Sequence, residues 1–187
     1  NDGDLDLFLA EGHGGARPEH APFDNANSFF ENGENGFRAI DIGDATQLDH
    51  VSAGAAGADI DRDGDIDLFV ANWSGEVLDN EFYRNRSEGN WIAFRPIGRT
   101  SNRLGVGARV RIEYMSGDIA SHQYRTLWLN TGYASMNAPI LHFGLGEAEA
   151  VAAVTVVWPS GETDVHRDVV ARHFYVAEEG GALRPEP

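Results

Sequence analysis

The sequence predicts an all-β protein, with partial β-propeller blades (about one and a half of them) followed by a small antiparallel β-sandwich or barrel. An aspartate-rich loop that opens directly onto a short apolar run occurs twice in the N-terminal half. The C-terminal half consists of short runs rich in β-branched and aromatic residues, which glycine, proline and asparagine turns separate. No segment carries an apolar stripe at helical spacing, so these three observations together favour sheets throughout.

The charge distribution divides the chain near residue 90. The 187 residues are 42% hydrophobic, which is enough to build a core. Residues 1–90 carry 20 acidic and 5 basic side chains, whereas residues 91–187 carry 10 and 9. We therefore expect propeller-blade repeats over 1–90, a β domain over 91–180 and a frayed tail over 181–187.

Composition excludes several classes of partner. A strongly acidic half argues against nucleic acid and against anionic membrane surfaces, except through bridging calcium. No apolar stretch approaches the roughly eighteen residues that a membrane span requires. The chain has no cysteine, which excludes disulfides and Cys-ligated zinc but leaves the compartment open. It starts inside a motif without an initiator Met, so we expect it to be the C-terminal piece of a longer protein.

The stretch Asp59–Asn72 reads Asp-Ile-Asp-Arg-Asp-Gly-Asp-Ile-Asp-Leu-Phe-Val-Ala-Asn. Carboxylates this close together repel one another, so a fold that keeps them needs a cation among them. The spacing suits calcium, with about six to eight oxygen ligands, better than magnesium, which needs a rigid octahedron. We expect Gly64 to adopt a positive φ at the sharp turn. The expected ligands are side-chain oxygens of Asp59, Asp61, Asp63 and Asp67 and the backbone carbonyl of Asp65.

Two alternatives share this pattern. One is an acidic surface loop without an ion, which would not need Asp at every odd position and Gly at the sixth. The other is the helix–loop–helix calcium hand, which requires a bidentate Glu at the twelfth position. Counted from Asp59, that position is Val70, and the flanks are β-rich. The stretch therefore favours a calcium loop that leads into a strand.

An internal repeat places this loop in a series. Residues 1–10 match the later loop from Arg62 onward at an offset of 61, and Phe29–Asn32 match Phe82–Asn85 at an offset of 53. The difference falls in 11–22, which we interpret as a lengthened loop with His13 and His20, while His50 belongs to a later loop. The period suits one four-stranded propeller blade per copy. The first copy retains Asp2, Asp4 and Asp6, which alone cannot complete a calcium shell.

The remaining elements are expected to be strands. In the first half this holds for 37–42, whereas the small, glycine-rich segment 52–57 indicates a tight backbone approach inside a blade. In the second half, short strands with turn punctuation suggest a sandwich or barrel. The expected strands there are 91–97, 108–114, 123–129, 140–143, 153–158 and 173–177.

No catalytic constellation emerges from the sequence. Ser160 stands in Trp-Pro-Ser-Gly-Glu, which is typical of a hairpin turn rather than of a nucleophile elbow. His122, His142 and His166 fall on separate segments, and His142 beside Phe143 is interpreted as a packed histidine. Glu113, Glu162 and Asp164 have no partner that the sequence identifies. We expect no enzymatic activity.

The motifs resemble two known families. Residues 58–72 resemble the calcium-binding FG-GAP (VCBS-type) repeat of integrin-α-like propellers. The second half resembles the ASPIC/UnbV domain through Gly98–Val110, Gly132–Ser135, His142–Gly146 and Val154–Gly161. The resemblance implies a secreted or surface-exposed protein whose propeller precedes this domain. It implies calcium ligands at Asp59, Asp61, Asp63, Asp65 and Asp67, and no catalytic residues.

Two functions from different classes follow. The first is a non-enzymatic calcium-binding extracellular module for recognition or adhesion, in which calcium stabilises the blade loops. Its partner would be an extracellular protein or glycan that the sequence does not identify. The alternative is a carbohydrate-binding or enzymatic module with its site on the C-terminal domain, where Trp128, Tyr133 and Trp158 could stack on sugar rings.

Overall fold

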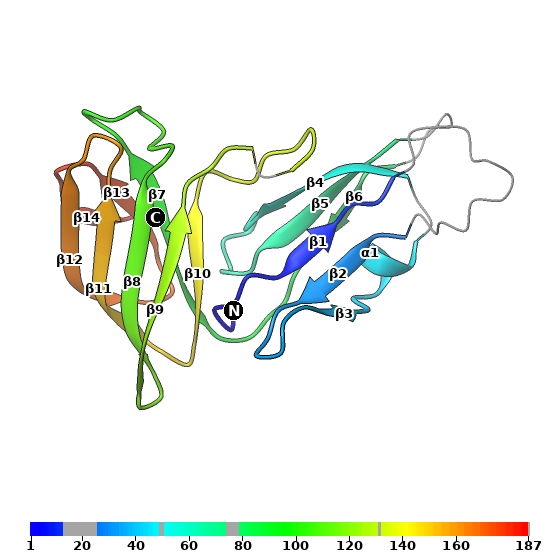
Figure 1. The fold of residues 1–187 in the computed structure, drawn as a ribbon, viewed down its shortest axis with the longest axis horizontal. Coiled ribbons are helices and arrows are strands. Elements are labelled where there is room, and N and C mark those ends of the chain that lie inside the picture. Colours follow the sequence, from blue (N-terminus) through cyan, green and yellow to red (C-terminus); the bar gives the residue numbers. More distant parts are fainter. Residues whose placement is uncertain (13–25, 49–50, 74–78, 131, 187) are drawn as a thin grey trace, which may run out of the picture.

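The prediction of an all-β protein is confirmed by a computed structural model, which describes residues 1–12, 26–48, 51–73, 79–130 and 132–186. The sheets of the first half lie on one side and those of the second half on the other (Figure 1). The lengthened loop expected over 11–22, with His13 and His20, lies outside the described residues except for its first two positions. His50 also lies outside them. No helix in the described part of the chain has the length and apolar character that a membrane span requires.

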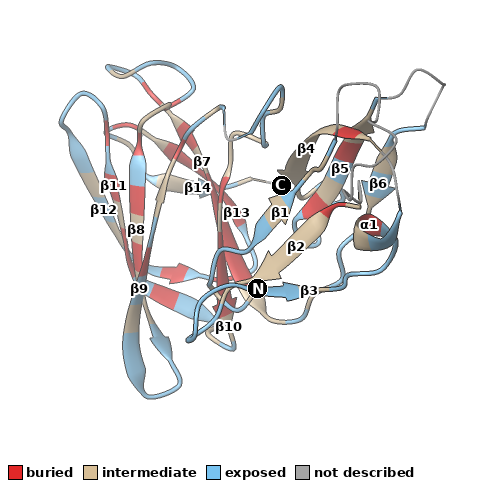
Figure 2. Cartoon of the chain, turned by 45° about the vertical axis from the view of Figure 1, so that its right-hand side comes forward, coloured by how far each residue is buried: buried red, intermediate tan, exposed pale blue. Residues whose placement is uncertain are grey.

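The first half forms two three-stranded antiparallel sheets, ordered β1-β2-β3 and β4-β5-β6. A four-residue helix, α1 (Asp44–Gln47), lies between them in the sequence. Pale blue and tan dominate these sheets in Figure 2, and β5 carries buried residues. The strands are β1 (Leu7–Leu9), β2 (Ser28–Glu31), β3 (Arg38–Ile40), β4 (Ser52–Ala58), β5 (Asp67–Asn72) and β6 (Glu81–Tyr83).

The two sheets share one strand pair in the same register. β1 pairs with β2 in the register in which β5 pairs with β6, once the offsets of 61 and 53 are applied. The opposed pairs are Leu7–Phe30, Phe8–Phe29 and Leu9–Ser28 in the first copy, and Leu68–Tyr83, Phe69–Phe82 and Val70–Glu81 in the second. The repeat read from the sequence is therefore a repeat of backbone structure.

The second half is a sandwich of two four-stranded sheets, ordered β10-β7-β13-β14 and β12-β11-β8-β9, and neither sheet closes into a barrel. Both sheets contribute to one apolar core, which includes Ile92, Phe94, Ile112, Phe143 and Val154. Burial of this core is the main favourable term for this half. The strands are β7 (Asn90–Ile97), β8 (Arg109–Ser116), β9 (Ile119–Thr126), β10 (Leu141–Gly146), β11 (Ala150–Val157), β12 (Thr163–Val170), β13 (Phe174–Glu178) and β14 (Leu183–Pro185).

Three features of the sandwich differ from expectation. β12 was not expected, because as an edge strand it is polar and mostly exposed and so lacks an apolar signal. The prediction of a frayed tail after Gly180 was wrong, because β14 pairs with β13 and places Tyr175 opposite Pro185. β7 and β13 run parallel, so the sandwich is not purely antiparallel.

One buried carboxylate joins the ASPIC/UnbV-like motifs. Glu179 is 4% exposed and accepts hydrogen bonds from the backbone N–H groups of Arg99 (2.7 Å), Thr100 (2.8 Å) and Ser101 (2.7 Å). The hydroxyls of Ser101 and Ser160 donate to its other oxygen at 2.8 and 2.5 Å. Residues around Arg99 and around Ser160 are thereby held together, which gives Ser160 a structural role in its hairpin turn.

The same hydrogen bonds make this carboxyl a strong acid. Desolvation alone would raise the pKa of Glu179, but the hydrogen bonds from Ser160, Ser101 and Arg99 outweigh it and lower the pKa to about 2. A depressed folded-state pKa contributes stability that is fully present above the unfolded value. That contribution is lost as the pH falls from about 4.5 towards about 2.

We expect Glu179→Gln to unfold at lower denaturant concentration than the unmodified chain at pH 7, because the amide is neutral and offers one acceptor oxygen where the carboxylate offers two. Its stability should also fall less steeply between pH 4.5 and pH 2. Urea unfolding followed by circular dichroism at several pH values measures both effects. Glu147→Gln, an exposed residue, serves as the control. Parallel pH curves for Glu179→Gln and the unmodified chain would contradict this role.

Candidate metal centre

The aspartate loop leads into β5, as expected, and Asp67 is the first residue of that strand; β4, which precedes the loop, was not predicted as a strand. Gly64 has φ +95°, which confirms the predicted turn. The loop is closed by its own side chains, since Asp59 Oδ2 accepts the Gly64 N–H at 2.8 Å and Asp67 Oδ2 accepts the Ile60 N–H at 3.1 Å. These bonds hold both ends of the loop together before any ion is considered.

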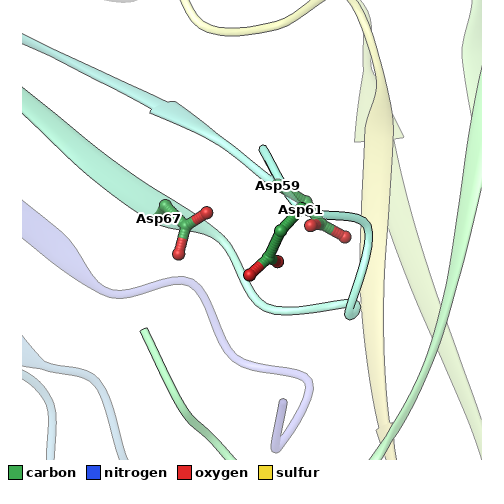
Figure 3. A group of neighbouring side chains, drawn as sticks. All are labelled: Asp59, Asp61 and Asp67. Atoms are coloured by element: carbon green, nitrogen blue, oxygen red, sulfur yellow. The ribbon is translucent and has the colours of Figure 1, made fainter. Parts of the chain in front are cut away.

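Three of the expected ligands converge. Asp59, Asp61 and Asp67 each offer a carboxylate oxygen, and these atoms all lie within 4.8 Å of one another. Figure 3 shows the three side chains gathered around the space between the loop and the start of β5. Asp59 Oδ1 is buried and has no hydrogen-bond donor. Desolvation raises the pKa of Asp59, so this carboxylate lacks the compensation that a cation would give.

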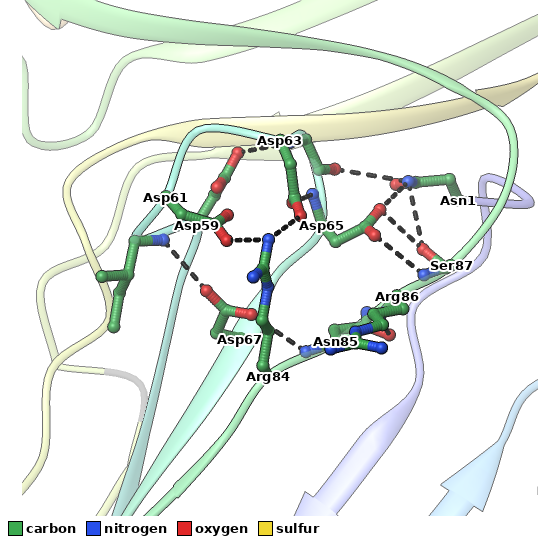
Figure 4. Close-up of polar contacts among 12 residues, drawn as sticks. Asn1, Asp59, Asp61, Asp63, Asp65, Asp67, Arg84, Asn85, Arg86 and Ser87 are labelled. Atoms are coloured by element: carbon green, nitrogen blue, oxygen red, sulfur yellow. Dashed lines mark hydrogen bonds and ion pairs between the residues drawn. The ribbon is translucent and has the colours of Figure 1, made fainter.

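The other two aspartates have different partners (Figure 4). Asp63 accepts the Asp65 N–H at 3.0 Å and pairs with Arg84 at 3.1 Å, and these contacts lower its pKa. The side chain of Asp65 is buried and accepts from Asn1 Nδ2 at 2.7 Å and from the Ser87 N–H at 2.8 Å. With its side chain engaged, Asp65 could approach an ion in the loop through its backbone carbonyl.

The segment that follows β6 contacts the loop through residues that the sequence pattern does not single out. Asn85 donates its N–H to Asp67 Oδ1 at 2.9 Å, Ser87 bonds Asp65, and Arg84 pairs with Asp61 as well as with Asp63. The repeat could have revealed Asn85, since it matches Asn32 at the offset of 53. Nothing in the sequence pattern marked Arg84.

The first copy keeps part of this arrangement. Asp6 Oδ1 accepts the Asn32 N–H at 2.9 Å, as Asp67 does from Asn85, and Asp2 accepts the Asp4 N–H at 3.1 Å, as Asp63 does from Asp65. Desolvation raises the pKa of Asp6. In the described residues, however, Asp2, Asp4 and Asp6 do not form a group with the close oxygen spacing of the second copy.

The loop also rests against the sandwich. The Gly64 carbonyl accepts from His142 Nε2 at 2.8 Å, and the imidazole of His142 stacks on Trp91 with ring centroids 5.9 Å apart. Burial lowers the pKa of His142 to about 4, so at neutral pH the ring is uncharged. Arg62 lies over the ring of Phe174 at 5.5 Å. His142 is therefore a packed histidine, as interpreted from the sequence, and it packs at the junction of the two halves.

Comparison with known proteins defines the class of the second domain. Residues 98–184 match the family model described as ASPIC and UnbV, which confirms that part of the resemblance. This match spans the Glu179 hydrogen-bond network, every strand from β8 to β13 and the start of β14.

Individual relatives extend the similarity into the first half. The chain is 29% identical over 143 residues to cartilage acidic protein 1 of Homo sapiens, covering 75% of this chain and 21% of that protein. The protein of the same name from Xenopus tropicalis is 29% identical over 125 residues, covering 66% and 18%. The chain thus spans about a fifth of the length of the curated relatives it matches.

Gly64→Ala should destabilise the protein by disrupting the contact between the two halves. A Cβ at Gly64 would overlap the indole ring of Trp91, in addition to the strain of a positive φ. We expect a loss of about 3 kcal/mol or more in the free energy of unfolding. Gly36→Ala is the matched control, because Gly36 has φ +90° with open space around it and should lose only about 1–2 kcal/mol. Equal losses in the two variants would show that the Trp91 contact contributes nothing.

Proposed function

We propose that this chain is a non-enzymatic, calcium-binding extracellular module for recognition or adhesion, in which calcium stabilises the blade loops. One observation carries the proposal: three carboxylates converge, and a buried oxygen of Asp59 has no donor. A hard cation with oxygen ligands supplies what that oxygen lacks. The similarity to cartilage acidic protein 1 supports an extracellular setting.

The residues present fit calcium. Asp59, Asp61 and Asp67 would supply side-chain oxygens, with Asp63 and the carbonyl of Asp65 completing the set expected from the sequence. Calcium, when bound, neutralises these carboxylates and cross-links the loop to β5. Because the loop also contacts Trp91 and His142, the ion would stabilise the contact between the halves as well as the blade.

We further propose that each three-stranded sheet is part of a propeller blade of the FG-GAP/VCBS type. The support is the shared register of the two copies and their matching loop contacts, in which Asp6 corresponds to Asp67 and Asn32 to Asn85. An aspartate-rich loop that repeats together with the strand pair that follows it fits blades that stack around an axis.

Calcium should raise the thermal stability of the first half. At 10 mM calcium and a dissociation constant of roughly 10⁻⁴–10⁻³ M, we expect about 1.4–2.7 kcal/mol of stabilisation. A chelator should expose the amides of 1–90 to hydrogen exchange before those of 91–187. Differential scanning calorimetry and hydrogen exchange with mass spectrometry measure the two effects.

Asp59→Asn should abolish most of the calcium-dependent shift, since it removes the charge on the oxygen that has no donor. Asp118→Asn, at the exposed β8–β9 turn, makes the same chemical change away from the loop and should leave the shift intact. Equal magnesium at matched ionic strength controls for screening. A melting curve that calcium leaves unchanged would refute structural calcium binding.

Exposed aromatic side chains favour a second candidate, carbohydrate binding. Trp128 is 61% and Tyr133 87% exposed, and both line the cleft between the halves. Exposed apolar groups gathered in one place mark interaction sites. Trp158 is excluded from such a platform, because it is 2% exposed and its Nε1 donates to Asp164 at 2.7 Å.

A glycan array with the full chain tests the second candidate. Saturable binding that Trp128→Ala or Tyr133→Ala removes would support it. Tyr124→Ala, a similarly exposed ring on β9, should leave that binding unchanged. No binding, or binding that all three variants reduce alike, would leave calcium-stabilised protein recognition as the better explanation.

A further inference from the structure

A basic side chain already stands beside the carboxylates of the loop. Arg84 follows β6 and its guanidinium pairs with Asp61 and, at 3.1 Å, with Asp63. Asp61 therefore belongs both to this ion pair and to the converging group with Asp59 and Asp67. Figure 4 shows the guanidinium between the loop and the strand end from which it projects.

Arg84 compensates only part of the cluster. It contacts Asp61 and Asp63, whereas Asp59 Oδ1 remains buried without a donor. The Arg84 side chain is 50% exposed, so it can turn into solvent without disturbing a packed core. Its neighbour Asn85 holds Asp67 through the backbone, so β5 and the strand end stay joined when the side chain moves.

The first copy shows that the repeat does not require this cation. At the offset of 53, the residue that corresponds to Arg84 is Glu31, which pairs with Arg38 on β3 rather than with the loop. The positive charge is therefore specific to the copy whose carboxylates converge. A guanidinium and a divalent ion that share Asp61 repel each other, so each weakens the binding of the other at this site.

We propose that Arg84 is an internal counter-cation, which neutralises Asp61 and Asp63 in the absence of calcium and is displaced when calcium binds. The inference rests on the proposed calcium function. Arg84 preserves the loop at low calcium, and in doing so it weakens the affinity of the site. The calcium concentration at which the loop responds is then set by a residue outside the ligand set.

Calcium titration of Arg84→Gln tests the inference. Without the competing charge, we expect calcium to bind about tenfold more tightly than to the unmodified chain by isothermal titration calorimetry. In chelator, the same variant should melt at a lower temperature, and saturating calcium should remove that difference. Arg84→Lys keeps the charge but cannot bond two carboxylates in a fork, so its affinity should lie between the two.

Arg86→Gln is the matched control, since it removes the same charge two residues away, and the described structure gives its side chain no ion pair with the loop. A similar gain in both variants would overturn the inference, because it would reflect net charge alone. If the unmodified chain binds calcium and Arg84→Gln binds it no more tightly, the inference fails while the calcium function stands. Binding by Arg84→Gln alone would overturn the inference as well, because calcium would then not displace Arg84 from the unmodified chain. Binding by neither overturns both.

Discussion

The backbone of Gly64 against the indole of Trp91 is the contact on which the rest of the structure depends. A Cβ at position 64 would collide with the ring. The aspartate loop can therefore approach the sandwich this closely only because residue 64 is glycine. His142 closes the same contact by donating to the Gly64 carbonyl. The loop whose carboxylates converge therefore also forms the contact between the two halves. A change in the backbone of this loop would alter how the halves pack together.

The internal repeat also gives way to the sandwich at this junction. Arg38–Ile40 of β3 correspond, at the offset of 53, to Trp91–Ala93, which belong to β7 of the sandwich. Where the blade pattern would place its last strand, the chain instead starts a sheet that pairs with β10 and β13. Trp91 thus corresponds to Arg38 of β3 in the repeat but belongs to β7 of the sandwich.

The sequence predicted well what depends on local pattern. The alternation of Asp59–Asp67, the positive φ of Gly64 and six strands of the sandwich all follow from short-range rules. It did not predict what depends on distant partners. β12 owes its place to pairing along β11, and Arg84 approaches Asp61 only because β6 lies beside β5. The contact between Trp91 and Gly64 could not be predicted from the sequence either, because a contact between two residues far apart in the chain leaves no periodic pattern.

The parallel pairing of β7 with β13 has a consequence for the order in which the chain acquires its structure. It brings Ala93 opposite Phe174, residues that lie far apart in sequence, and such long-range closure is slow. The surface that receives the loop includes Trp91 from β7 and Phe174 from β13. During synthesis, therefore, the aspartate loop leaves the ribosome well before β13 and completes its contact with Phe174 only after that strand has emerged.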